Sequence, residues 1–148
     1  MKRFIHAMAG GLALTLLLVF WLSSAASEVS GDHDLIRAVK TAILYALPAL
    51  IVCLVVTGGS GMALGGQWRH SLIGVKKRRM AVAAGNGLLI LVPSAIFLWW
   101  KAQAGAFDAQ FAIVQAAELL SGAANIVLLS LNTRDGLGLR SRPRRSQG

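Results

Sequence analysis

Four long runs of apolar residues dominate the pattern along the chain, and short polar connectors separate them. The runs cover residues 4–26, 38–63, 80–100 and 106–131. A helix that crosses the hydrocarbon core of a bilayer needs about 20 mostly apolar residues, so each run is long enough. The period-two alternation of a membrane β-barrel is not visible, and backbone groups in lipid must otherwise bond within a helix. The pattern predicts an all-α integral membrane protein with four transmembrane helices.

The connectors set the expected topology. Because they are short, neighbouring helices should pack antiparallel as a four-helix bundle. Twelve of the 15 Lys and Arg residues lie on one side, and only Arg37, Lys40 and Lys101 lie on the other. Positive residues favour the cytoplasmic side, so the N-terminus and the C-terminus should both be cytoplasmic. We expect a transmembrane domain over residues 1–132 and a basic cytoplasmic tail over residues 133–148.

Composition agrees with a lipid environment. Apolar residues make up 55% of the chain and charged residues 14%, whereas soluble domains carry about 25% charged residues. The net charge of +9 gathers beside apolar runs, as in Lys76, Lys77, Arg78 and Arg79, which favours anionic lipid headgroups over nucleic acid as the partner. Cys53 is the one cysteine in the sequence, so an internal disulfide is excluded.

The first run has a second interpretation. Lys2 and Arg3, the apolar core and Ser24-Ala25-Ala26 are also typical of a secretory signal with a small-residue cleavage site. The run is long for a signal peptide, which favours a retained helix. Cleavage after Ala26 would leave three spans in the same orientation.

The fourth run contains the most informative polar pattern, a seam with alternating spacings of four and three. Its members are Phe111, Gln115, Glu118, Gly122, Asn125, Leu129 and Asn132. This is the period of a helix–helix interface. An ionised carboxylate near mid-span costs at least about 2.5–3.5 kcal/mol, so Glu118 should face the bundle, either protonated or hydrogen-bonded. We expect no Lys or Arg deep enough in the spans to pair with it.

Depth along the predicted helices suggests partners for this seam. Asn86 in the third run and Asn125 lie at similar depths, and so do Tyr45 in the second run and Gln115. Hydrogen bonds between such pairs stabilise membrane bundles by about 0.6 kcal/mol each. Glu118 then has two interpretations, a structural residue that holds helices together or a group that takes up a proton or ligand.

Glycines gather at the end of the second run, with Gly58 and Gly61 in the sequence Gly-Gly-Ser-Gly and Gly65 four residues on. A phosphate-binding loop would follow a strand and open a helix, whereas a membrane helix precedes these glycines. The spacing of Gly61 and Gly65 matches the small-xxx-small pattern of close helix packing.

Histidines are the candidate haem or metal ligands. His6 and His70 lie on the predicted cytoplasmic side, and His33 stands between Asp32 and Asp34 in an outer connector. A haem held between helices needs ligands from within the bundle. We therefore expect no cofactor and keep His6 with His70 as the alternative.

Four motifs resemble a group of small, uncharacterised bacterial inner-membrane proteins. They are Gly58-Gly59-Ser60-Gly61, Lys77-Arg78-Arg79-Met80, Asn86-Gly87-Leu88-Leu89 and Asn132-Thr133-Arg134-Asp135-Gly136-Leu137. The resemblance implies a bacterial inner-membrane location and no particular activity. The start His6-Ala7-Met8-Ala9-Gly10-Gly11 more faintly resembles copper-resistance D-type and b-type cytochrome bundles, which would need further histidines in later spans that this chain lacks.

Three functional hypotheses follow. The first is a non-enzymatic accessory or scaffold subunit that packs through its helices against a protein partner or further copies of itself, because no catalytic set of residues stands out. The second is a haem-binding or redox membrane protein using His6. The third is a small proton-linked transporter subunit centred on Glu118.

Overall fold

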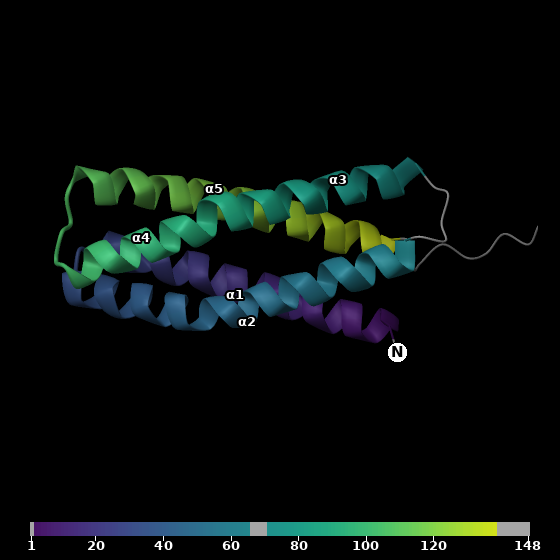
Figure 1. Cartoon of the computed structure of the whole chain (residues 1–148), viewed down its shortest axis with the longest axis horizontal. Coiled ribbons are helices and arrows are strands. Elements are labelled where there is room, and N and C mark those ends of the chain that lie inside the picture. The colour runs from purple at the N-terminus through teal and green to yellow at the C-terminus, as the bar shows by residue number, and fades with distance from the viewer. Residues whose placement is uncertain (1, 66–70, 139–148) are drawn as a thin grey trace, which may run out of the picture.

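The computed structural model describes residues 2–65 and 71–138, and these residues form helices joined by short turns (Figure 1). The helical segments are α1 (Lys2–Ser30), α2 (His33–Gly65), α3 (Ser71–Asn86), the π-helical turn η1 (Gly87–Leu91), α4 (Val92–Gln103) and α5 (Ala109–Gly138). Four stretches are long and apolar enough to cross a membrane: Phe4–Ser30, His33–Gly61, Arg78–Gln103 and Ala109–Arg134. The predicted all-helical class and the four candidate spans are confirmed. The helices are longer than the apolar runs, and α2 begins five residues before the predicted start.

The third span is one rod made of α3, η1 and α4, and its irregular turn precedes Pro93. Proline lacks the backbone N–H that an α-helix needs, and its ring clashes with the carbonyl four residues earlier. The chain accommodates this with a wider turn, in which the N–H of Val92 bonds to the carbonyl of Gly87. The third span therefore accommodates Pro93 through a π-helical turn.

Contacts between α1 and α2 show how these two helices lie against each other. His6, near the start of α1, contacts Ser60 near the end of α2, whereas Ser24, late in α1, contacts Lys40 early in α2. Figure 1 shows the α1–α2 turn and the α4–α5 connection at one end of the bundle, and the N-terminus toward the other. We call the end with these two connections the turn end, and the opposite end, toward which the N-terminus and the Arg78 and Arg79 segment lie, the basic end.

Specific residues fix the two connections at the turn end. Gly31 and Gly105 adopt φ of +66°, which disfavours other residues. Asp32 caps α2 by accepting the backbone N–H of Asp34 at 2.9 Å. Asp108 accepts the N–H of Phe111 at 3.0 Å and pairs with Lys101 at 2.6 Å. Because of the hydrogen bond from Lys101, supported by the Phe111 N–H, the pKa of Asp108 lies below its ordinary value.

Large apolar side chains cover much of the exterior. Among the exposed residues are Val29, Leu89, Ile113, Leu120 and Val127 on α1, η1 and α5. The buried hydrophobic residues are fewer, and small side chains such as Ala13, Ala83, Ala95 and Ala102 are common among them. Apolar exteriors and small interior residues are typical of helices that pack within lipid.

Candidate functional site

The polar seam of α5 faces the other helices. Phe111, Gln115, Gly122, Asn125 and Asn132 are buried, and Glu118 and Leu129 are half-buried. The spacing of four and three therefore predicted the inward face of α5 correctly.

Glu118 forms an ion pair, which corrects the expectation that no cation lies deep enough to meet it. Lys40 Nζ lies 2.6 Å from Glu118 Oε2, and the two side chains are only 1% and 12% exposed. The expectation was wrong because the apolar run begins at residue 38, whereas α2 begins at His33. With a rise of 1.5 Å per residue, Lys40 lies about 10 Å inside the helix.

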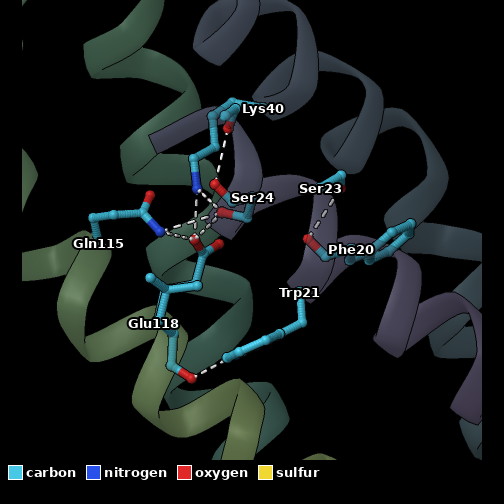
Figure 2. A network of polar contacts seen from close by, with 9 residues as sticks. Phe20, Trp21, Ser23, Ser24, Lys40, Gln115 and Glu118 are labelled. Carbon is cyan, nitrogen blue, oxygen red and sulfur yellow. Dashed lines mark hydrogen bonds and ion pairs between the residues drawn. The ribbon is translucent and has the colours of Figure 1, made fainter. Parts of the chain in front are cut away.

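Ser24 and Gln115 complete a polar cluster that joins α1, α2 and α5 (Figure 2). Lys40 Nζ donates to Ser24 Oγ at 2.7 Å, and Gln115 Nε2 donates to both Ser24 Oγ and Glu118 Oε2 at 3.2 Å. We call Ser24, Lys40, Gln115 and Glu118 the polar cluster. Sequence reasoning missed Ser24, and its only signal was the spacing of small polar residues at Ser23, Ser24 and Ser27.

Acceptors exceed donors around the polar cluster. Gln115 Oε1 and Glu28 Oε1 are buried and have no hydrogen-bond partner among the described residues. The Glu118 carboxylate sets the orientation of the Gln115 amide, because an ionised carboxylate can only accept the hydrogen bond from Nε2. Glu28 lies one helical turn after Ser24 on α1, so two carboxylates share the neighbourhood of one ammonium.

The cavity beside Glu118 is small. It has a volume of about 60 Å³, and apolar side chains such as Leu17, Phe20 and Leu47 form most of its wall. Ligand pockets for small molecules usually measure about 300–1,000 Å³. The surroundings of Glu118 can therefore admit a proton or a water molecule, but they have no room for a larger substrate.

Trp21 fixes α1 against α5 next to the cluster (Figure 2). Its Nε1 donates to the carbonyl of Leu119 at 2.8 Å, and its ring covers Gly122 so closely that a Cβ there would lie 2.8 Å from Cδ1. Gly122 thus belongs to the seam because it makes room for this ring. Trp21 therefore packs between α1 and α5.

A second polar contact joins α3 to α5 and matches the pairing expected from depth. Asn86 Nδ2 donates to Asn125 Oδ1 and to the carbonyl of Ser121, each at 2.9 Å. Asn125 Nδ2 in turn donates to the carbonyl of Ala83 at 3.2 Å. The other expected pair is wrong, because Tyr45 is 79% exposed and Gln115 belongs to the polar cluster.

His6 lies at the basic end of the bundle, and its Nδ1 is 3.1 Å from the Thr57 carbonyl and 3.0 Å from Ser60 Oγ. A carbonyl can only accept, so Nδ1 carries the proton, and in the neutral ring Nε2 is an acceptor. Gly61 packs against this ring, since a Cβ there would lie 3.1 Å from Cε1. His70 lies outside the described residues. The described residues contain no group of three or more His, Cys, Asp or Glu that could hold a metal ion.

Of the remaining site residues predicted from the sequence, some are described by the structure and others are not. A Cβ at Gly58 would meet no atom within 4 Å, and Arg78 is exposed. Gly65 is the last residue of α2, and its packing lies outside the described part of the chain, as do the side chains of Lys76 and Lys77.

Comparison with protein-family models, with curated proteins and with solved structures found no match.

Proposed function

We propose that the protein is a multi-pass membrane protein, an antiparallel four-helix bundle whose basic end faces the cytoplasm, and that it acts as a non-enzymatic subunit which packs through its helices. The charge pattern supports the orientation. Five of the six acidic residues, but only three of the 15 basic ones, lie at or near the turn end. The motif resemblance supports the bacterial inner membrane as its location.

Tyr45 is the observation that carries the proposed packing role. It lies two residues from the midpoint of the span His33–Gly61, so its depth is close to the centre of the bilayer. Its side chain is 79% exposed and makes no hydrogen bond with the described residues. A hydroxyl group in hydrocarbon without a partner is unfavourable by roughly 2–7 kcal/mol. A second helix that covers Tyr45 would remove this penalty.

The face of α2 around Tyr45 has the shape that such a helix needs. The exposed residues at alternating spacings of four and three are Ala38, Ala42, Tyr45, Ala49, Val52, Val56 and Gly59. This is the period of a helix–helix interface, and its small side chains permit close approach.

A second copy of the chain fits this face better than an unrelated helix. A two-fold axis along the membrane normal brings α2 of one copy against α2 of the other at the same depth. A phenol hydroxyl both donates and accepts, so Tyr45 of one copy can bond to Tyr45 of the other. We therefore propose a homodimer through this face of α2.

Disulfide crosslinking tests the dimer. In a Cys53→Ala background, Ala49→Cys should give a crosslinked dimer in membranes, because position 49 meets its own copy across the axis. Leu120→Cys is the matched control, since Leu120 is similarly exposed but lies on α5, and it should stay monomeric. Equal crosslinking at both positions, or none at Ala49→Cys with a monomeric mass in mild detergent, would contradict the proposal. A stoichiometric foreign partner crosslinked at position 49 would contradict the homodimer and leave an accessory role.

A second candidate function, proton binding at the polar cluster, is favoured by the unpartnered oxygens of Glu28 and Gln115. A site with more acceptors than donors can take up a proton. Proton flux in proteoliposomes tests this role, because Glu118→Gln should abolish a flux that passes through the cluster. Wild-type flux equal to that of empty vesicles would remove the candidate.

A further inference from the structure

A cavity of about 230 Å³ lies at the basic end of the bundle, well away from the polar cluster. Residues of α1, α2, α3 and α5 surround it, among them His6, Gly11, Thr57, Met80 and Asn132. Most of its wall is apolar. One water molecule occupies about 30 Å³ of liquid, so the cavity can hold a group much larger than a single water.

Asn132 points to a ligand in this cavity. Its side chain is only 7% exposed, and neither Nδ2 nor Oδ1 has a hydrogen-bond partner in the described part of the chain. Leaving a buried polar group unpaired is costly, and buried amides are nearly always hydrogen-bonded. The ligand must therefore offer an acceptor for Nδ2 and a donor for Oδ1.

His6 adds a second acceptor to the same cavity. Its Nδ1 proton is engaged by Thr57 and Ser60, so Nε2 of the neutral ring is left to accept. The cavity wall thus presents one donor group and two acceptors. A ligand with oxygen acceptors and at least one hydroxyl group complements this arrangement.

Depth and charge restrict the chemical class of the ligand further. Asn132 lies two residues before the end of the span Ala109–Arg134, at the level where phospholipids place their glycerol and phosphate. Arg79 and Arg134 directly adjoin the lining residues Met80 and Thr133 in sequence. Positive charge at this level attracts anionic lipids. Exposed Gly11 and Thr133 form part of the wall, so the cavity opens on the outside of the bundle between α1 and α5.

We propose that this cavity binds a phosphoglycerol group, supplied by an anionic glycerophospholipid such as phosphatidylglycerol. The phosphate or ester oxygens accept from Asn132 Nδ2, and the glycerol hydroxyls donate to Asn132 Oδ1 and His6 Nε2. The first carbons of the lipid lie along the apolar wall. The inference rests on the proposed membrane location but is independent of the α2 dimer.

Lipid retention measured by native mass spectrometry tests the site. The full chain is reconstituted with equal amounts of phosphatidylglycerol and phosphatidylcholine and is then released into detergent. Wild type should keep one phosphatidylglycerol per chain. Asn132→Leu, which removes both polar atoms without leaving an unsatisfied group, should retain it about tenfold less. Gly11→Leu, which fills the mouth of the cavity, should lose it as well.

Arg78→Gln is the control for general charge attraction, and it should reduce overall lipid enrichment while keeping the one tightly held molecule. Equal retention by wild type and Asn132→Leu, or equal retention of both lipids, would overturn the proposal and leave a cavity that holds water only. Addition of sn-glycerol 3-phosphate distinguishes the sources. If this soluble compound displaces the lipid and raises the unfolding temperature of wild type but not of Asn132→Leu, the ligand is a soluble phosphoester and the lipid assignment is overturned. Because the dimer is tested by crosslinking at position 49, a negative result for lipid retention leaves the proposed dimer unaffected.

Discussion

Replacing Lys40 by methionine removes the ammonium from the polar cluster while keeping a long apolar stem. Lys40 is 1% exposed, and its Nζ contacts both Ser24 and Glu118. Removal of one partner from a buried ion pair leaves the other charge buried without compensation, which costs about 3–5 kcal/mol. We expect Lys40→Met to lower the free energy of unfolding by this amount.

A double-mutant cycle separates the pair from its two members. Glu118→Met should cost a similar amount on its own, because it leaves the Lys40 ammonium unpaired. The double variant places two apolar side chains of suitable length in the same space, and such replacements are often nearly neutral. Its loss should therefore be far smaller than the sum of the two single losses, which is about 6–10 kcal/mol.

The assay is reversible unfolding in mixed micelles, followed by tryptophan fluorescence and helical circular dichroism. Arg37→Met is the control, because Arg37 pairs with the exposed Asp34 and its side chain is 40% exposed. An exposed pair contributes about 0–1 kcal/mol. Single-variant losses below about 1 kcal/mol would refute the interpretation of Lys40 and Glu118 as a buried pair. A double variant whose loss equals the sum of the single losses within about 0.5 kcal/mol would refute it as well.

Two further perturbations test the surroundings. Gly122→Ala should destabilise the bundle by about 1–3 kcal/mol, because the added Cβ would lie 2.8 Å from the Trp21 ring. Gly58→Ala is the control, because its added Cβ meets no atom within 4 Å, and it should be neutral or stabilising. Equal melting temperatures for the two variants would contradict the close contact at Gly122. At the turn end the lowered pKa of Asp108 means that its stabilising contribution is complete above the ordinary carboxyl pKa and is lost as the pH falls through the lower folded value. Lys101→Met should weaken this acid-induced loss in thermal melts between about pH 5 and pH 2, and an unchanged pH profile would argue against the Lys101 contact as the main cause.

The spans and the inward face of α5 could be predicted because both depend on periodicity. Apolar runs mark the membrane-crossing length, and the spacing from Phe111 to Asn132 marks the helix face. The Asn86–Asn125 contact also followed from depth, since each amide needs a partner inside the bundle and few polar groups lie at that level.

The partner of Glu118 could not be found in the same way, because hydropathy does not locate a helix start. The signals that place Lys40 inside α2 are the cap at Asp32 and the acidic residue Asp34 in the first turn. A lysine two turns beyond such a cap lies within the helix even though it precedes most of the apolar run.

Tyr45 shows the limit of arguments from depth alone. Residues in an α-helix are separated by about 100°, so Tyr45 lies about 140° around the helix from Lys40. Once Lys40 faces the bundle, Tyr45 must face away from it. Depth matched Tyr45 to Gln115, but the helix rotation that separates them depends on the buried ion pair, which was not expected.

The distance between Lys40 Nζ and the Glu118 carboxyl carbon, measured by solid-state NMR dipolar recoupling in lipid bilayers, tests the central claim most directly. Selective ¹⁵N and ¹³C labelling of lysine and glutamate side chains, with Lys40→Met as the blank, separates the signal of this pair from those of the other four lysines, Lys2, Lys76, Lys77 and Lys101. We expect strong dephasing that disappears in Lys40→Met, because the two charged groups are in direct contact within a membrane-inserted bundle. Dephasing no stronger than in Lys40→Met would contradict it.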